Sequence, residues 1–251
     1  MLGQITIRFY EELNDFLQAE QCKTPFVCDL KFGRSVKDLI ESLGVPHTEV
    51  DLILVNGESV DFNYLVRDGD QISVYPVFES LDISPVIRLR PKPLRDPQFV
   101  LDTHLGKLAA YLRLLGFDCL YRNDYDDPIL ASISVEHHRI LLTCDIGLLM
   151  RKQITHGYFV RQRQPQQQLL EIVARFDLAG MLRPFTRCLH CNGELQAVDK
   201  ADIEQQLLPR TREFYQEFWR CDQCHKVYWK GSHYQRMLQI ISSLVPQHHS
   251  V

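Results

Sequence analysis

Hydrophobic residues recur with two different periods in the first 80 residues of the chain. Apolar side chains alternate with polar ones over residues 4–10, which is typical of a strand with one buried face. Residues 35–44 place apolar side chains at helical spacing between a capping serine and a final glycine, which predicts a short helix. Apolar runs at 52–55 and 71–78, each next to a glycine-containing turn signal, predict further strands. The pattern therefore predicts a small mixed sheet with one packed helix, in the order strand, strand, helix, strand, strand.

Strands and helices alternate over residues 98–165. Two short apolar runs in this region are each followed by a stretch with apolar side chains at helical spacing, and two more apolar runs come later. Such alternation favours an α/β fold with a parallel sheet. The expected strands are residues 98–101, 117–121, 139–143 and 157–160, and the expected helices are residues 104–115 and 127–135.

Four cysteines form two matched pairs, Cys188-x2-Cys191 and Cys221-x2-Cys224. Two such pairs can present four thiolates to one tetrahedral ion, which is a ligand set that structural Zn²⁺ prefers. The 29 residues between the pairs exceed the ~15–20 of the simplest pattern, and a short helical insertion at 201–208 accounts for the excess. Two disulfides are the alternative. We see no secretory signal and no transmembrane run, which indicates a cytoplasmic, reducing location and favours zinc.

Charge is unevenly distributed along a chain of ordinary globular composition, with 45% hydrophobic and 24% charged residues and a net charge of −4. Residues 1–85 carry 6 Lys/Arg against 15 Asp/Glu, whereas residues 86–251 carry 22 against 17. A basic rear part that holds a zinc module is compatible with nucleic-acid binding. A stretch with four prolines and four basic residues indicates a semi-rigid linker. The expected division is 1–80, the linker 81–97, 98–183, a zinc ribbon at 184–236 and a C-terminal tail at 237–251.

Aspartates follow the expected strands of the α/β segment. Asp102 follows the first strand and Asp145 the third, while Asp124 and Asp127 lie after the second. Because the carboxyl ends of parallel strands line the ligand crevice of an open sheet, these side chains can converge there. Carboxylate oxygens suit Mg²⁺ or Mn²⁺, and such an ion would let an acidic pocket accept a phosphodiester. The alternative is that Asp102, Asp127 and Asp145 simply cap helices.

Cationic side chains accompany the aspartates and the zinc module. Lys107, Arg113 and Arg151 are candidates for contacts with phosphate oxygens, although each can equally be an exposed helix charge. The zinc module combines basic and aromatic residues that either form an RNA-binding surface or fill the small core of the ribbon. These residues are Arg187, Arg212, Arg220, Lys226, Lys230, Phe218, Trp219, Tyr228 and Trp229.

Four short motifs stand in the first 80 residues: RFY at 8–10, SVKDLI at 35–40, VNG at 55–57 and DGDQI at 68–72. The segment that contains them resembles the β-grasp sulfur-carrier and ubiquitin-like proteins. Carriers of that family end in a free Gly-Gly, whereas here the last strand continues as YPVFES at 75–80 into more protein. The resemblance therefore implies an accessory or docking module with a protein partner, rather than a sulfur carrier.

Five further motifs are FVLDTHLGKLA at 99–109, LRLLGFD at 112–118, RILLTCD at 139–145, CLHCNG at 188–193 and CDQCHKVYWKGSH at 221–233. They are similar to those of the Mut-seven carboxy-terminal RNase family, in which a zinc ribbon follows a PIN-like domain and bacterial members carry a ubiquitin-like extension. The resemblance implies metal-assisted RNA hydrolysis, with Asp102 and Asp145 as ligands of Mg²⁺ or Mn²⁺ and with Asp124 and Asp127 as further catalytic residues. The family often has Arg where this chain has Cys144.

We therefore expect a cytoplasmic protein of three modules: a β-grasp domain, a PIN-like α/β domain with a parallel sheet, and a C-terminal zinc ribbon. The expected function is that of a metal-dependent ribonuclease, with structural Zn²⁺ in the ribbon and Mg²⁺ or Mn²⁺ at the aspartates. The alternatives are a non-catalytic RNA-binding protein associated with the ribosome or tRNA, and an adaptor whose β-grasp domain binds a protein partner. No membrane association is expected.

Overall fold

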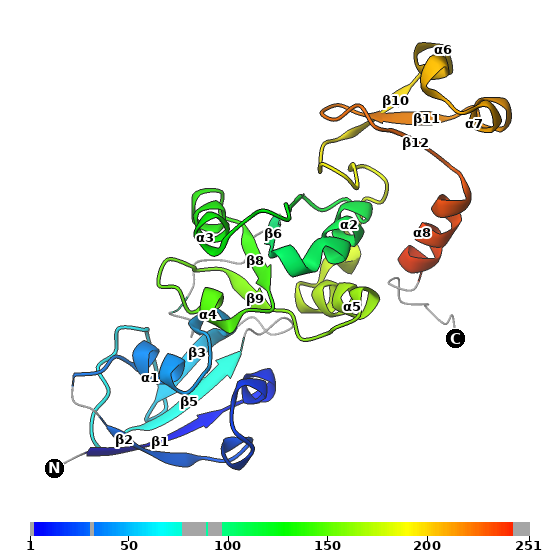
Figure 1. Cartoon of the computed structure of the whole chain (residues 1–251). Coiled ribbons are helices and arrows are strands. Elements are labelled where there is room, and N and C mark those ends of the chain that lie inside the picture. Colours follow the sequence, from blue (N-terminus) through cyan, green and yellow to red (C-terminus); the bar gives the residue numbers. More distant parts are fainter. Residues whose placement is uncertain (1–2, 31–32, 77–88, 90–96, 243–251) are drawn as a thin grey trace, which may run out of the picture. The chain divides into compact units, whose positions relative to one another are not determined.

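The 251 residues form a series of short helices and strands in this computed structural model (Figure 1). The linker expected at 81–97 lies outside the described residues except for Leu89 and Pro97, and so do residues 243–251 of the expected tail. The residues that the structure describes are 3–30, 33–76, 89 and 97–242.

Two compact units make up the chain. The first combines residues 1–96 with residues 127–159, and the second combines residues 97–126 with residues 160–251. The α/β segment expected at 98–183 therefore contributes to both units. Two of its four strands share a unit with the β-grasp fold, and the other two share a unit with the zinc ribbon.

A five-stranded sheet and one α-helix form the front of the first unit. They are β1 (Gly3–Phe9), β2 (Phe26–Leu30), α1 (Val36–Ser42), β3 (Val50–Val55), β4 (Glu58–Val60) and β5 (Gln71–Pro76), with short 3-10 helices at Glu11–Phe16, Ala19–Gln21 and His47–Glu49. The strand order is β2-β1-β5-β3-β4, in which β1 and β5 are parallel and the other pairs antiparallel. Helix α1 covers one face of the sheet (Figure 1). The expected β-grasp fold is confirmed, and the structure locates β2 and β4, which the hydrophobic pattern did not.

Helix α1 begins and ends where the sequence predicts. The Ser35 hydroxyl accepts a hydrogen bond from the Asp38 amide at 3.1 Å, which caps the first turn. Gly44 has a φ of +95°, a conformation that favours glycine and ends the helix. Between them, Val36 and Ile40 are fully buried against the sheet. Local capping and a single apolar face thus fix this element before any long-range contact forms.

Buried polar contacts join the β-grasp fold to residues 127–159 within the same unit. Glu49 is fully buried, and its Oε1 accepts a hydrogen bond from the Phe159 amide at 2.6 Å. The buried His47 donates from Nε2 to the Ile154 carbonyl oxygen at 2.8 Å. The ring of Phe16 meets that of Phe159 edge-on at 5.5 Å. Because buried polar groups are costly to leave unpaired, these contacts make the β-grasp fold an integral part of the first unit.

Parallel strand pairs form the α/β segment, which confirms the expected parallel sheet. The first unit contributes α3 (Asp127–Glu136), β8 (Ile140–Thr143), α4 (Ile146–Leu149) and β9 (Gly157–Phe159). The second contributes β6 (Phe99–Leu101), a 3-10 turn (Thr103–Leu105), α2 (Gly106–Leu114), β7 (Cys119–Leu120), α5 (Pro165–Arg175) and a further 3-10 turn (Leu178–Met181). Strand β6 is parallel to β7 in the second unit, and β8 is parallel to β9 in the first. Helices α4 and α5 are additions to the elements that the sequence predicted.

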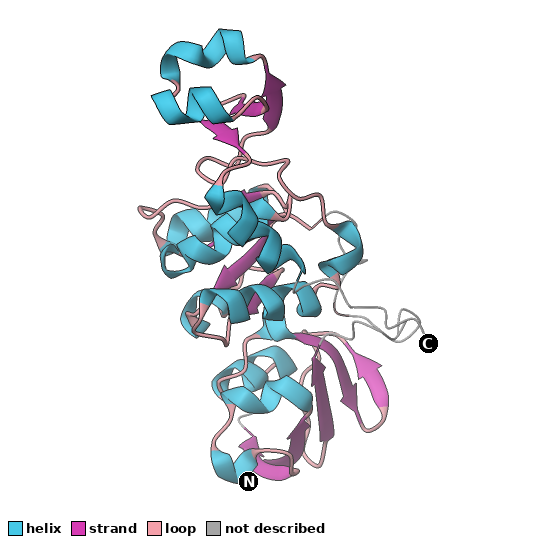
Figure 2. Ribbon diagram, turned by 90° about the vertical axis from the view of Figure 1, so that its right-hand side faces the viewer, coloured by secondary structure: helices cyan, strands magenta, loops and turns pink. Residues whose placement is uncertain are grey.

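A three-stranded antiparallel sheet lies in the second unit where the zinc ribbon is expected, with helices α6 and α7 beside it (Figure 2). The ribbon comprises β10 (Leu195–Val198), α6 (Lys200–Ile203), a 3-10 turn (Glu204–Gln206), α7 (Pro209–Phe214), β11 (Phe218–Cys221) and β12 (Val227–Trp229). Its helical insertion matches the prediction for residues 201–208. Helix α8 (Ser232–Ser242) differs from expectation, because it runs through residues 237–242 that were assigned to the tail. In the described part of the chain, every helix is too short or too polar to cross a bilayer.

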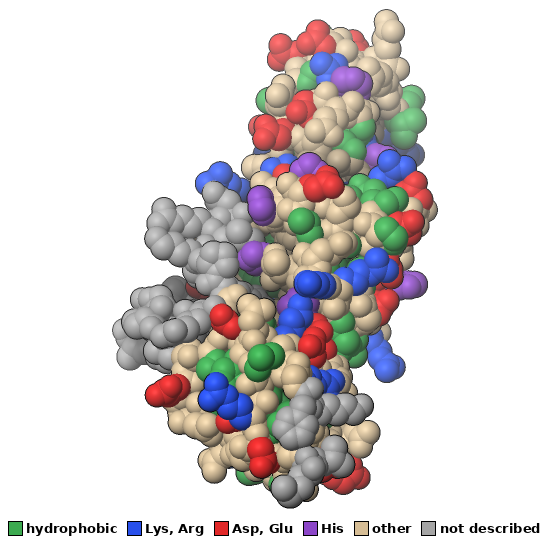
Figure 3. Space-filling view, turned by 90° about the vertical axis from the view of Figure 1, so that its left-hand side faces the viewer, with side chains coloured by type: hydrophobic (Ala, Val, Ile, Leu, Met, Phe, Trp, Pro, Cys, Tyr) green, Lys and Arg blue, Asp and Glu red, His purple; other side chains and the backbone are tan. Residues whose placement is uncertain are grey.

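Charged side chains of both signs are mixed on the face of the molecule that Figure 3 presents. Acidic and basic groups alternate there instead of gathering by sign. The uneven charge of the sequence therefore does not locate an RNA-binding site on this face. Such a site has to be inferred from individual side chains.

Candidate functional site

Two tight turns with the same backbone form present the four cysteines. The first turn precedes β10 and the second joins β11 to β12. The residue after the second cysteine of each pair adopts a left-handed conformation, with φ of 73° at Asn192 and 59° at His225. The Asn192 amide donates to the Cys188 carbonyl at 3.0 Å, and the His225 amide donates to the Cys221 carbonyl at 3.2 Å. The site is therefore built from two equivalent halves.

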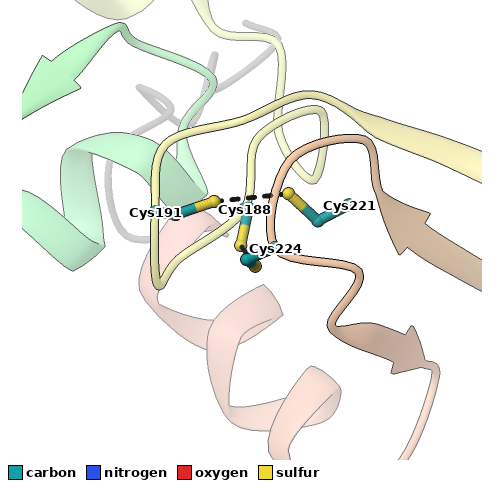
Figure 4. Close-up of side chains that lie close together, drawn as sticks. All are labelled: Cys188, Cys191, Cys221 and Cys224. Atoms are coloured by element: carbon teal, nitrogen blue, oxygen red, sulfur yellow. Dashed lines mark hydrogen bonds between the residues drawn. The ribbon is translucent and has the colours of Figure 1, made fainter.

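The four sulfur atoms converge on one point (Figure 4). All of them lie within 4.8 Å of one another, with 3.6 Å between Cys188 and Cys224 and 3.3 Å between Cys191 and Cys221. Tetrahedral Zn²⁺ with bonds of ~2.3 Å places its sulfur ligands about 3.8 Å apart, so the residues fit this ion with small adjustments. Four thiolates leave no open coordination position. The four cysteines could thus hold one metal ion in a closed site, with a ligand set suited to structural zinc.

Hydrogen bonds prepare one of the four thiols for ionisation. Burial disfavours the Cys188 thiolate, but hydrogen bonds from the Tyr228 hydroxyl at 3.1 Å and from the amides of Cys191 and His190 outweigh it, and the pKa of Cys188 falls to about 7. Burial raises the pKa of the other three thiols. Because Zn²⁺ binds thiolates, Cys188 is the ligand most readily available at neutral pH.

Arg113 joins the first cysteine turn to strand β7. Its side chain is buried, and its guanidinium donates to the Cys119 carbonyl at 2.7 and 2.9 Å. The same group donates to the carbonyls of Leu189 and His190 at 3.2 and 2.9 Å, between the two cysteines of the first pair. Burial lowers the pKa of Arg113, and neighbouring thiols and a carboxylate oppose this shift. The sequence predicted a phosphate contact for Arg113, whereas the structure places its guanidinium on backbone carbonyls.

Asn192 and Arg187 complete this junction, and sequence reasoning gave neither of them this role. The buried Asn192 accepts from the Cys119 amide at 3.0 Å through Oδ1 and donates to Asp118 at 2.8 Å through Nδ2. Arg187 donates to the carbonyls of Gly116 and Asn192 at 3.2 and 3.0 Å. An asparagine directly after a Cys-x2-Cys pair predicts a left-handed turn. Its side-chain partners cannot be predicted in this way, because they lie more than 70 positions away in sequence. The first half of the metal site is therefore bonded to the α/β strand.

We expect Arg113→Lys to lower the free energy of unfolding of the zinc-loaded chain by about 2–4 kcal/mol. A lysine keeps the charge but cannot reach three carbonyls at once, and each buried carbonyl that loses its donor costs ~1–3 kcal/mol. Chemical denaturation followed by circular dichroism measures the change. Lys107→Ala, an exposed position on the same helix, serves as the control and should change stability by less than ~0.5 kcal/mol. Equal stability of Arg113→Lys and the parent chain would contradict the role of this junction.

Asp102 and Asp145 have different surroundings. Asp102, in the second unit, directly follows β6 and is 9% exposed; it stands at the cap position of the next turn but makes no capping bond. Its Oδ1 accepts a hydrogen bond from the Thr103 hydroxyl at 3.0 Å. Asp145, in the first unit, caps α4, because its Oδ1 accepts from the amides of Gly147 and Leu148 at 2.7 and 3.4 Å. The capping alternative therefore accounts for Asp145 and not for Asp102.

The remaining predicted residues are placed on exposed or partly exposed surface. Arg151 donates to Asp127 at 3.0 Å, which brings a predicted phosphate contact and a predicted catalytic residue together in the first unit. Asp124 forms a two-point ion pair with Arg122 at 2.9 and 2.6 Å, and both side chains are largely exposed. Lys107 is exposed on α2. Among the described residues, the four cysteines are the set of three or more ligating side chains close enough to share one ion, so an aspartate cluster stays a prediction.

Two protein-family models match most of the chain. Residues 97–241 match the Mut7-C RNAse domain, and residues 2–82 match the Mut7-C ubiquitin domain. The first match covers more than half of the 251 residues and includes Asp102, Asp145 and the four cysteines. A search of curated proteins finds no match.

Solved structures similar to part of the chain come from Haloferax volcanii. The crystal structure of SAMP1 shares 16% identity and a TM-score of 0.25, and the alignment covers 31% of this chain and 99% of that one. A crystal structure of small archaeal modifier protein 1 shares 16% identity and a TM-score of 0.24, over 30% of this chain and 97% of that one. Similarity at this level carries no functional argument.

Proposed function

The chain belongs to the Mut7-C RNAse domain family, and on this premise we propose that it is a metal-dependent ribonuclease acting through the aspartates of its α/β segment. The observation that carries the proposal is the family match over residues 97–241, which includes Asp102, a largely buried carboxylate at the end of a parallel strand. A carboxylate at the end of a parallel strand can offer an oxygen ligand to a hard divalent cation. We therefore propose Mg²⁺ or Mn²⁺ as the cofactor.

Each aspartate has a proposed role that follows from its surroundings. Asp102 and Asp145 would hold the ion, since Asp145 uses only Oδ1 in its described capping bonds and can offer its second oxygen. Asp127 would be held in position by Arg151, and Asp124 would join the site if its exposed pair with Arg122 opens. A bound divalent cation supplies activation of water and stabilisation of the leaving oxygen. Lys107 and Arg151 are then the candidates for holding phosphate oxygens of the RNA.

The β-grasp domain and the zinc ribbon would support the nuclease in different ways. We propose that the β-grasp fold, through Glu49 and His47, stabilises the segment that contains Asp127 and Asp145. The ribbon would add RNA contacts beside its structural metal. We also propose that the protein is cytoplasmic and that the β-grasp fold binds a protein partner.

A cleavage assay on end-labelled single-stranded RNA tests the proposed function. The full chain should cut the RNA with Mn²⁺ or Mg²⁺, and a strong chelator of these ions should stop the reaction, because the acidic site needs the cation to accept a phosphodiester. Ca²⁺ is a useful third condition, since its looser coordination supports binding more readily than in-line chemistry. A chain that binds RNA but never cuts it with either metal would instead be a non-catalytic RNA-binding protein.

A further inference from the structure

A cavity of about 270 Å³ lies in the second unit between the zinc ribbon, the segment that leads into it, the end of α2 and helix α8. Its lining contains none of the four cysteines and none of the predicted aspartates, although its Tyr228 hydroxyl lies 3.1 Å from the Cys188 sulfur. Its size is just below the ~300–1,000 Å³ of small-ligand sites, which suits a single flat group better than a folded partner. The lining residues are Leu114, Pro184, Phe185, Arg187, Leu189, Leu195, Trp219, Tyr228, Trp229, Lys230, Tyr234 and Met237.

Aromatic rings dominate the lining of this cavity. Both tryptophans of the chain, Trp219 and Trp229, are among them. Trp219 lies opposite Tyr228 across β11 and β12, while the rings of Phe185 and Tyr234 have centres 4.5 Å apart and are tilted by 32°. A ribbon core would bury its largest rings, yet Trp229 is 37% exposed. Trp229 therefore both packs in the ribbon and presents part of its ring to the cavity.

Gly231 holds one of these planes in place. A Cβ atom at this position would come within 2.9 Å of Nε1 and 3.3 Å of Cδ1 of Trp229, so the lack of a side chain here lets the indole lie close against the backbone. An aromatic ring fixed in this way loses little conformational entropy when a ligand stacks on it. The cavity thus has a preorganised aromatic wall.

Two cations and no acidic residue line the cavity. Arg187 is committed to backbone carbonyls and to Asp118 at 3.6 Å, so it contributes positive potential from a fixed position. Lys230 lies 5.3 Å from the centre of the Trp219 ring, and its described partner is the exposed Glu217 at 2.6 Å. An ion pair between exposed side chains is worth at most ~1 kcal/mol, so a phosphate can replace Glu217. The rim of the cavity is complementary to an anion.

We propose that this cavity binds an unstacked base of single-stranded RNA, with the base stacked on Trp229 and Lys230 contacting an adjacent phosphate. This inference rests on the proposed function, because it assigns a second RNA contact to the same substrate. Base stacking on aromatic planes beside a flexible cation is the general mode of single-strand recognition. An apolar peptide would contact the rings but would make no use of Lys230, whose exposed ion pair with Glu217 a phosphate can replace. The site would hold the strand through one nucleotide while the aspartates act on another.

Intrinsic fluorescence provides a direct test, because both tryptophans line the cavity. The zinc-loaded full chain is titrated, without Mg²⁺ or Mn²⁺, with oligoadenylate of about eight nucleotides, a length within the site sizes of single-strand binders. We expect the oligoadenylate to quench the emission, and an abasic ribose-phosphate strand of equal length to leave it unchanged. Trp229→Ala should weaken binding about 5- to 150-fold, whereas Trp229→Phe, which keeps a stacking plane, should retain most of it.

Two further variants sharpen the test. Lys230→Gln should reduce the slope of log affinity against log salt by about 0.7, the contribution of one phosphate contact on a single strand. Phe214→Ala removes a 70% exposed aromatic ring that does not line the cavity, and it should bind like the parent chain. Circular dichroism confirms that each variant keeps its fold.

The outcomes separate this proposal from the nuclease assignment. If quenching depends on the bases and on Trp229 but the chain never cleaves RNA, the base-binding proposal is supported and the ribonuclease assignment is refuted. If the chain cleaves RNA with metal but binds abasic and normal strands equally well, the base-binding proposal is refuted and the ribonuclease assignment stands. The same holds if Trp229→Ala binds RNA as tightly as the parent chain. Absence of any quenching by oligoadenylate would likewise overturn the cavity proposal.

Discussion

Replacing Asp102 with asparagine is expected to abolish metal-dependent RNA cleavage while RNA binding and the fold survive. Asparagine has nearly the same shape and can still accept the hydrogen bond from the Thr103 hydroxyl. It removes the negative charge that would hold a divalent ion at the end of β6. Loss of a partner that only orients a metal ligand already costs ~10–100-fold, so loss of a proposed ligand should reduce the cleavage rate by more than about 100-fold.

The measurement compares initial cleavage rates with Mn²⁺ at equal fractions of bound RNA. Asp199→Asn is a matched control, because Asp199 occupies the same type of position before α6, with a φ of −65° against −62° for Asp102, and neither makes a capping bond. The control should cleave like the parent chain, since Asp199 lies in the ribbon insertion. Undiminished cleavage by Asp102→Asn would refute the assignment of Asp102, and loss of activity in both variants would indicate a general effect of removing charge.

Capping residues and periodic apolar positions made several elements predictable from sequence alone. Helix α1 depends on Ser35, Gly44 and one apolar face, all within ten residues, so local signals determine it. The parallel strands β6 and β8 are short, but nearly all of their residues are buried, which makes them visible as continuous apolar runs. The cysteine pairs were equally predictable from sequence, because each half of the metal site is a local turn.

Elements on edges and surfaces were harder to predict. Strand β2 alternates, yet its residues are mostly partly exposed and Val27 is 61% exposed, so its apolar signal is weak. Helix α5 was overlooked although Pro165 opens it and Leu169, Ile172 and Val173 are buried on one face. In that case the signal was present, because proline at the first helical position followed by this spacing predicts a helix.

Roles that depend on distant contacts could not be obtained from sequence. Arg113 has the spacing of an exposed helix charge, and its actual partners, Leu189 and His190, lie 76 and 77 positions away. Glu49 reads as a surface acid but accepts a hydrogen bond from Phe159, 110 positions away. Sequence also could not separate Asp145, which caps a helix through its side chain, from Asp102, which makes no such capping bond, because the difference lies in the folded backbone geometry. Long-range packing, and not composition, decides these roles.

Removing zinc is expected to unfold the ribbon and to loosen β7, while the β-grasp fold stays intact. Among residues 184–242, the buried apolar side chains are Cys188, Ile203, Phe218 and Cys221, so two of the four are metal ligands. Such a core cannot stabilise the ribbon by burial alone, whereas structural Zn²⁺ contributes about 10–16 kcal/mol of apparent binding free energy at neutral pH. Cys221→Ser should therefore lose bound zinc and most of the amide protection of the ribbon.

Hydrogen exchange can follow this effect into the α/β segment residue by residue. The Cys119 amide donates to Asn192 in the first cysteine turn, so it should exchange much faster once that turn is released. The Ile7 region of β1, in the other compact unit, should keep its protection. Cys28→Ser changes a cysteine outside the metal site and should retain both zinc content and protection of Cys119. A ribbon that stays protected without metal, or a Cys119 amide that is indifferent to zinc, would mean that the Arg113 and Asn192 contacts do not couple the metal site to the strand that they join.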